Sequence, residues 1–105
     1  MSIEGIEERI IQVCCGWGLY DDENASDFTR FDKLAEEVDE LEEALFTKDD
    51  PDQVLMEGGD VAVTLINLLH KRGFTLEQAL FAAYMKIKDR KGQMINGVYV
   101  KEEDL

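Results

Sequence analysis

The chain has 105 residues, of which 45% are apolar and 33% are charged, so it is long enough for one ordinary domain with a hydrophobic core. Its 24 acidic and 11 basic residues give a formal net charge of -13, which argues against binding nucleic acid through phosphates and against docking on anionic membranes. No apolar run approaches the roughly 20 residues that a membrane-spanning helix needs.

The N-terminal segment and the cysteines indicate a cytoplasmic protein. The first ten residues, MSIEGIEERI, carry acids where a secretory signal peptide needs a positive region followed by an apolar stretch. The adjacent Cys14 and Cys15 have no other cysteine as a disulfide partner, and we expect them to be reduced, buried thiols. We therefore expect a cytoplasmic location.

The first two predicted elements are amphipathic helices joined by a polar loop. Apolar residues recur at spacings of three and four from residue 3 to about residue 17, and the polar segment 18–26 follows. A second helix is predicted from about residue 28 to 47, with Ser26 or Asp27 as its cap. One face of this helix is a stripe of large apolar side chains, and the other face is rich in acids.

The third predicted helix, from about residue 51 to 71, is apolar nearly all round. Pro51 suits its first turn and Asp50 its cap. Such a helix is typical of the centre of a bundle or of an oligomer. Because a chain of this length covers a central helix poorly, we expect a homo-oligomer with helices of two protomers lining each site.

The last predicted elements are a fourth helix and a hairpin. Thr75 and Gln78 form a capping box that begins the helix, which ends near residue 91. The dipeptide Asn96-Gly97 lies between short apolar runs and predicts a β-hairpin or extended arm. The whole pattern predicts an all-α fold: an antiparallel bundle of four main helices with a short C-terminal hairpin, in a single domain over residues 1–105.

Two pairs of acids lie at helical spacing on the second and third helices. Glu37 and Glu40 are three apart in the run E-E-x-x-E that begins at Glu36, and they share one side of their helix. Glu57 and Asp60 are likewise three apart, inside the helix that is apolar nearly all round. Buried carboxylates that converge without partners are costly and repel one another. A divalent cation removes this cost, and oxygen ligands without His or Cys suit Mg²⁺ or Mn²⁺.

The acids also have a simpler interpretation, since an acid-rich helix face is usually just solvated. For E-E-x-x-E alone this interpretation is the more frequent one. An E-x-x-D inside an apolar helix is harder to explain in that way, and two such pairs on antiparallel neighbouring helices are a specific signal. Gly58 and Gly59 each lower the helix propensity by roughly 1 kcal/mol, which makes sense if the backbone approaches another helix or a ligand closely.

The segment KLAEEVDELEEAL, followed by MEGGDVAVTLINLL, resembles the E-E-x-x-E … E-x-x-D signature of the MazG-like all-α nucleotide pyrophosphohydrolases. The resemblance covers most of the chain and extends to the closing segment KIKDRKG … NGVYVK, which is similar to small stand-alone phage and bacterial members. It implies an α-helical bundle that assembles as a dimer or tetramer. It also implies Mg²⁺-dependent hydrolysis of (deoxy)nucleoside triphosphates to monophosphate and pyrophosphate, as nucleotide-pool housekeeping.

The resemblance implies roles for individual carboxylates. Four of them would be the metal ligands: Glu37, Glu40, Glu57 and Asp60. Glu36 would be an outer carboxylate, a ligand of a second metal or the base that activates water, so Glu36, Glu37 and Glu40 are the catalytic candidates. Asp39 stands where many members have Gly, which adds charge near the site and leaves the number of metal ions open.

Four other residues are candidates for substrate contacts. Lys86 and Arg90 match a K-x-x-x-R spacing that the resemblance implies would hold phosphate oxygens. Trp17 could stack on a nucleobase, although a lone Trp at a helix end is more often a core residue. Asn67 faces the same general side as Asp60, and it either contacts the substrate or bonds a neighbouring helix.

A function of a different class remains open from the sequence. A small acidic helical protein can mimic DNA and bind a basic partner without catalysis. That interpretation predicts acids spread over the surface and no metal requirement. The apolar third helix, with acids inside it, speaks against it.

Overall fold

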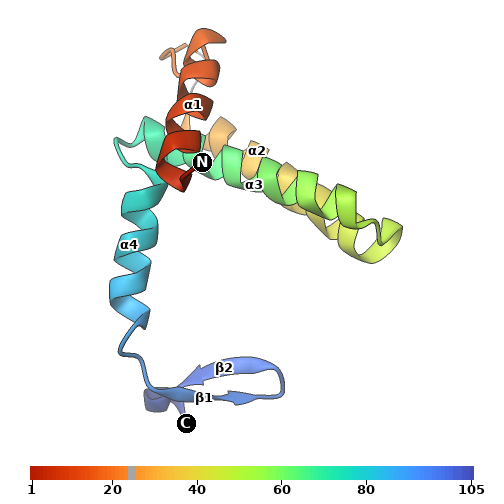
Figure 1. Cartoon of the computed structure of the whole chain (residues 1–105), viewed down its shortest axis with the longest axis vertical. Coiled ribbons are helices and arrows are strands. Elements are labelled where there is room, and N and C mark those ends of the chain that lie inside the picture. Colours follow the sequence, from red (N-terminus) through yellow and green to blue (C-terminus); the bar gives the residue numbers. More distant parts are fainter. Residues whose placement is uncertain (24–25) are drawn as a thin grey trace.

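The computed structural model describes residues 1–23 and 26–105, and helices dominate this part of the chain (Figure 1). The helices are α1 (Ile3–Gly16), α2 (Asp27–Glu43), the π-helical turn η1 (Ala44–Lys48), α3 (Pro51–Lys71) and α4 (Leu76–Ile87). The strands β1 (Gly92–Ile95) and β2 (Val98–Lys101) and the 3₁₀ turn η2 (Glu102–Asp104) follow. The predicted all-α class, with four main helices and a C-terminal hairpin, is confirmed. The polar segment 18–26 includes residues 24–25, which lie outside the described part.

The helices begin where their capping residues allow. Ser26, rather than Asp27, caps α2 by accepting a backbone N–H bond of 3.0 Å at its hydroxyl. Asp50 caps α3, with Pro51 in its first turn, and the capping box of Thr75 and Gln78 at α4 is complete. Ser2 caps α1 in the same way as Ser26 caps α2, so all four helix starts are local consequences of the sequence.

The second and fourth helices end earlier than the periodicity predicts. The α-helical part of α2 stops at Glu43, and the chain continues as the π-helical turn η1 until Asp49, whose φ of 48° is left-handed. After α4 a turn leads into β1. Asn96 and Gly97 have φ of 50° and 81°, as a type I′ hairpin turn requires, and β1 pairs antiparallel with β2. The predicted hairpin is confirmed.

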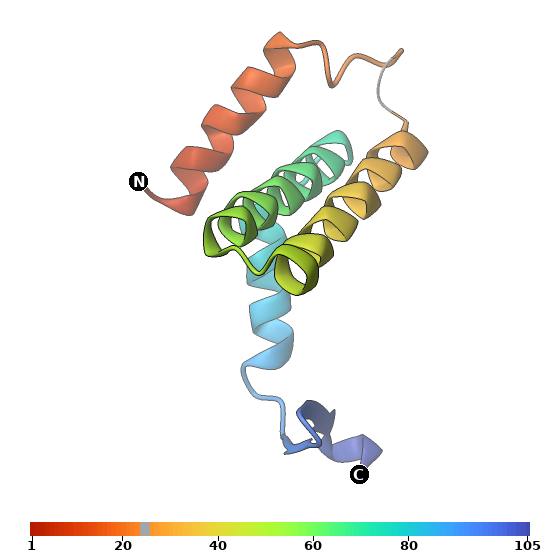
Figure 2. The same cartoon turned by 90° about the vertical axis from the view of Figure 1, so that its right-hand side faces the viewer.

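The antiparallel pair α2–α3 is the centre of the fold. The two helices lie side by side in both views (Figures 1 and 2). At one end of the pair, Arg72 at the end of α3 is ion-paired with Asp27 at the start of α2. Lys71 Nζ also lies 3.0 Å from the Asp22 carboxylate in the preceding loop. The first ion pair joins α2 and α3 at this end, and the second ties the loop before α2 to α3.

Tyr20 anchors the loop after α1 to α3. Its hydroxyl donates a hydrogen bond of 2.6 Å to Oδ1 of the buried Asn67. Its ring also packs against His70 with a centroid distance of 4.3 Å. Burial of the hydroxyl raises the pKa of Tyr20 well above its ordinary value, so Tyr20 stays a neutral hydrogen-bond donor at physiological pH.

A buried carboxylate on α1 sets the direction of α4. Glu7 is only 3% exposed, and its two oxygens accept hydrogen bonds from the backbone N–H groups of Leu76 and Glu77, the first two residues of α4. A carboxylate at a helix N-terminus also interacts favourably with the helix dipole. From this point α4 leads away from the α2–α3 pair and carries the hairpin at its far end (Figure 1).

The described chain buries few apolar side chains. The buried ones are Cys14, Ala44 and Ile66, whereas 23 large apolar side chains are exposed. Cys15, which we expected to be buried, is exposed because the helix turns it about 100° away from Cys14. None of the described helices combines the length and the apolar composition that a bilayer crossing needs.

The chain is less compact than a folded monomer of its size. The accessible surface is 7908 Å², against about 6,000 Å² for a compact monomer of this mass. The radius of gyration is 16.5 Å, against about 13 Å for a compact chain of this length. The excess surface, about 1,900 Å² per chain, is what obligate protein interfaces bury.

Gly58 and Gly59 are not required by any close approach within the described chain. A Cβ added at either position has no heavy atom within 4 Å outside its own helix turn, so the expectation of a close helix contact is wrong for the isolated chain. We expect Gly59→Ala to stabilise α3 by roughly 0.5 to 1 kcal/mol, because alanine restricts the unfolded chain and favours the helix.

Chemical denaturation of the wild type and of Gly59→Ala measures this change. Gln53→Ala, an exposed helix substitution in α3, is the matched control. Destabilisation by Gly59→Ala would contradict the expectation and would show that another chain or a ligand approaches this surface.

Candidate functional site

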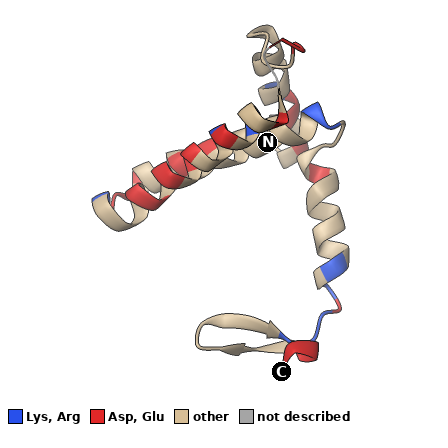
Figure 3. Cartoon of the chain, turned by 180° about the vertical axis from the view of Figure 1, so that it is seen from behind, with Lys and Arg blue, Asp and Glu red and all other residues tan. Residues whose placement is uncertain are grey.

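Five carboxylates gather in the middle of the α2–α3 pair. Oxygens of Glu36, Glu37 and Glu40 lie within 4.8 Å of one another, and so do oxygens of Glu37, Glu57 and Asp60. Glu37 belongs to both groups and links the acids of α2 to those of α3. The view by charge shows acidic residues along both helices (Figure 3). The structure therefore brings together all five acids singled out from the sequence.

The spacing of the acids explains this convergence. Residues three or four apart on a helix share one side, so each of the two acid pairs presents its carboxylates in one direction. Because α2 and α3 run antiparallel, the second half of α2 lies beside the first half of α3. The two pairs therefore meet at the same level of the helix pair, although 16 residues separate Glu40 from Glu57 in the sequence.

Two carboxylate oxygens in this cluster are buried without a hydrogen-bond partner among the described residues: Glu37 Oε2 and Glu57 Oε2. Glu37 itself is only 7% exposed. Leaving a buried acceptor unsatisfied costs about 1 to 3 kcal/mol, and more when the acceptor is charged. A hard divalent cation would satisfy both oxygens, and the absence of His and Cys from these two groups of acids favours Mg²⁺ or Mn²⁺ over Zn²⁺. The residues present thus fit such an ion.

The electrostatics of the cluster centre on Glu37. Burial raises the pKa of the Glu37 carboxyl, and the neighbouring Glu40 raises it further, while Lys33 opposes both effects. Lys33 Nζ lies 3.3 Å from Glu37 Oε1 and 3.4 Å from Glu36 Oε1. The hydrogen bond to Glu37, together with the contact to Glu36, raises the pKa of Lys33 in turn. One ammonium group therefore offsets part of the negative charge of Glu36 and Glu37.

Lys33 is a residue of this site that the sequence interpretation missed. It precedes Glu36 by three residues and Glu37 by four, which are the spacings that place side chains on one helix face. The helical spacing that paired the acids would therefore also have identified Lys33 as a neighbour of Glu36 and Glu37.

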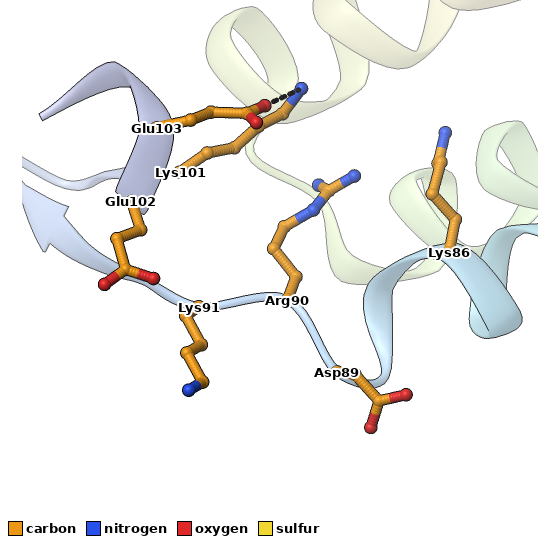
Figure 4. Close-up of a pocket in the computed structure, with 7 residues that line it drawn as sticks. All are labelled: Lys86, Asp89, Arg90, Lys91, Lys101, Glu102 and Glu103. Atoms are coloured by element: carbon orange, nitrogen blue, oxygen red, sulfur yellow. Dashed lines mark ion pairs between the residues drawn. The ribbon is translucent and has the colours of Figure 1, made fainter.

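Lys86 and Arg90 line a separate pocket of about 540 Å³ between the end of α4 and the C-terminal segment. Lys91 and Lys101 add two further cations, and Asp89, Glu102 and Glu103 are the acids of the lining (Figure 4). Within the pocket Lys101 is paired with Glu103 at 3.9 Å. The expected pair of basic residues is thus in one place, in a pocket lined by four basic and three acidic residues that we call the basic pocket.

This basic pocket does not join the carboxylate cluster within one chain. Lys86 lies in the last turn of α4, and both cartoon views show α4 running away from the α2–α3 pair (Figures 1 and 2). None of the five clustered carboxylates lines the pocket. If Lys86 and Arg90 hold substrate at the cluster, they must do so for another copy of the chain.

Neither of the two remaining candidates, Trp17 and Asn67, belongs to the carboxylate cluster. Trp17 follows the last residue of α1 and is 72% exposed, so it is not the core residue that a lone Trp usually is. Asn67 is buried, and its amide oxygen accepts the hydrogen bond from Tyr20. Of the two interpretations of Asn67, the structure therefore gives direct support to a structural bond, here to the loop after α1.

A comparison with protein families adds the decisive observation. The model of the MazG nucleotide pyrophosphohydrolase domain matches residues 27–95. This chain belongs to the MazG family. The matched region contains all five carboxylates, Lys33 and the Lys86–Arg90 pair, whereas α1 and Trp17 lie before it. Comparisons of this MazG chain with curated proteins and with solved structures gave no match.

The raised pKa of Glu37 predicts how the metal-free MazG chain responds to pH. Because the folded-state pKa is above the ordinary value of 4.5, the folded chain binds protons more readily than the unfolded chain. Its stability should therefore fall as pH rises from the ordinary value through the raised one. We expect Glu37→Gln to remove this dependence and to raise the unfolding temperature near pH 7.

Thermal unfolding in EDTA between about pH 4 and pH 8 measures the effect. Glu43→Gln, at an exposed acid of the same helix, is the matched control and should leave the dependence in place. Parallel curves for wild type and Glu37→Gln would contradict the expectation.

Proposed function

We propose that this chain hydrolyses (deoxy)nucleoside triphosphates to nucleoside monophosphate and pyrophosphate with Mg²⁺ or Mn²⁺ as cofactor. Four carboxylates would hold the ion: Glu37, Glu40, Glu57 and Asp60. The observation that carries the proposal is the pair of buried oxygens, Glu37 Oε2 and Glu57 Oε2, without hydrogen-bond partners in the described part of a MazG chain. We further propose that residues 1–105 form one domain that acts in the cytoplasm on nucleotide pools.

The chemistry requires water to attack the α-phosphorus. A new phosphorus–oxygen bond forms there, the bond to the bridging oxygen breaks, and pyrophosphate leaves with the electron pair. A divalent cation held by the four carboxylates would neutralise charge on the triphosphate and lower the pKa of a bound water. The Glu36 side chain is 57% exposed, so it is accessible to take the proton of the attacking water or to serve as an outer or second-ion ligand.

The single-domain proposal is supported by contacts of α1, which lies outside the region matched by the family. α1 packs against α3. Glu7 of α1 caps α4, and Tyr20 in the following loop bonds Asn67 of α3. The N-terminal helix is therefore tied to the two helices that carry the candidate site residues 57–90.

The arrangement supports a homo-dimer or homo-tetramer with shared sites. The basic pocket around Lys86 and Arg90 lies away from the carboxylates of its own chain, and the chain exposes the surface expected of a subunit. We propose that the pocket of one copy faces the carboxylates of another. There Lys86 and Arg90 would neutralise charge that develops on the leaving pyrophosphate.

The first experiment measures pyrophosphate release from a panel of NTPs and dNTPs, with Mg²⁺ and with EDTA. We expect release that depends on metal. Because loss of a residue that merely supports a metal ligand costs 10- to 100-fold, Asp60→Asn and Glu40→Gln should lower turnover by at least about 100-fold while the circular dichroism spectrum stays unchanged. Glu43→Gln, on an exposed part of α2, should remain active.

Two outcomes would contradict the proposal. A fully active Asp60→Asn protein would exclude the metal-site assignment. A folded wild type that releases no pyrophosphate from any triphosphate and binds neither Mg²⁺ nor Mn²⁺ would favour the non-catalytic acidic interaction protein instead.

A mixing experiment tests the shared site. Asp60→Asn and Arg90→Met should each be inactive alone, because each lacks one half of every site. After subunit exchange, a mixed dimer contains one intact site, so random mixing should recover about a quarter of the wild-type activity. Asp60→Asn mixed with Glu40→Gln is the control and should recover none. No recovery after verified exchange would place both halves of the site in one chain.

A further inference from the structure

Lys33 is a cation at the carboxylate cluster with no role in the function proposed so far. Its ammonium group lies 3.3 Å from Glu37 Oε1 and 3.4 Å from Glu36 Oε1. It therefore contacts the α2 acids of the cluster within a single chain, without any contribution from a second copy.

Helix stability alone is a weak explanation for this lysine. An ion pair of this spacing stabilises a helix by about 0.2 to 0.5 kcal/mol, and the order with Lys before Glu is the less favourable one. The Lys33 side chain is 50% exposed, so solvent screens the pair further. The contribution is small beside the cost of the buried acceptor that the same carboxylate carries on its other oxygen.

The position of Lys33 suits an anionic ligand better. Its ammonium contacts two carboxylates of a five-carboxylate cluster, and a triphosphate that binds there adds more negative charge. The lysine stem has four rotatable carbons, and its head is accessible to solvent. Any phosphate that lies against Glu36 and Glu37 comes within reach of this head, because the head already touches both carboxylates.

We propose that Lys33 is a substrate-binding residue of this site: its ammonium rests on Glu36 and Glu37 in the free chain and binds a phosphate oxygen of the nucleoside triphosphate in the complex. The inference rests on the proposed function and deepens it. It assigns a phosphate contact within the same chain, in addition to the contacts that Lys86 and Arg90 would provide from another copy.

Metal binding and nucleotide binding distinguish a phosphate-binding Lys33 from a merely structural one. Loss of a structural lysine would weaken both, whereas loss of a phosphate-binding lysine would weaken only nucleotide binding. If Lys33 only held Glu37 in place, its loss would weaken metal binding. If Lys33 binds phosphate, its loss removes a competing positive charge from the carboxylates of the free chain. Metal binding without nucleotide then stays the same or tightens, while nucleotide binding weakens.

The test uses the full chain with Lys33→Met, Lys33→Arg and the control Lys48→Met. Lys48 lies 15 residues further along, in η1, roughly 22 Å away along the helix axis. Mn²⁺ alone is titrated by electron paramagnetic resonance. A deoxynucleoside triphosphate with an α,β-imido bridge is then titrated by calorimetry in the presence of Ca²⁺, and steady-state kinetics give KM and kcat.

We expect Lys33→Met to bind Mn²⁺ at least as tightly as the wild type. Its Kd for the imido analogue and its KM should rise about ten- to hundredfold, as loss of a hydrogen bond to a charged group predicts. Lys33→Arg should recover most of this loss, and Lys48→Met should match the wild type.

Two results would overturn the inference: wild-type affinity of Lys33→Met for the imido analogue, or a parallel loss of Mn²⁺ and analogue binding. Failure of the proposed function gives a different result, because the wild type itself would then bind neither Mn²⁺ nor the analogue.

Discussion

Mutual repulsion among the five carboxylates that α2 and α3 bring together is the constraint on which the rest of the structure depends. The helices can pair only if their apolar contacts outweigh this repulsion. Two features reduce it in the free chain: Lys33 pairs with Glu36 and Glu37, and burial favours the protonated form of Glu37. A cation that binds the folded pair and not the unfolded chain would stabilise it by linkage. The stability of the helix pair and the binding of a cation at the carboxylates are therefore thermodynamically coupled.

The charge distribution along the chain follows from the same constraint. Acids dominate α2 and the first half of α3, whereas several of the basic residues lie between residue 86 and residue 101. A single chain keeps these regions apart, because α4 carries the basic pocket away from the helix pair. Its many exposed apolar side chains leave room for a second copy to cover them. A chain with a net charge of -13 thus gathers several of its cations in one region, away from its clustered acids.

Most local features of this fold could be predicted from the sequence, and most non-local ones could not. The caps Asp50 and Thr75 and the turn at Asn96-Gly97 were predictable because their causes lie within a few residues. The carboxylate cluster was predictable because helical spacing and antiparallel order were enough to bring it together. The direction of α4 was not, since it depends on Glu7, 69 residues before Leu76. The exposure of Gly59 was not predictable either, because it depends on which surfaces one chain leaves uncovered.

The contact between Glu7 and the start of α4 has a consequence for the order of folding. α2 and α3 are neighbours in sequence and can form a helical hairpin early, because closing the short connection between them loses little chain entropy. The two N–H groups that Glu7 binds are synthesised only after about three quarters of the chain. During synthesis the Glu7 carboxylate therefore stays solvated while the α2–α3 hairpin can already form. We therefore expect α4, together with the C-terminal arm that it carries, to gain its orientation late in folding, when Glu7 meets the start of α4.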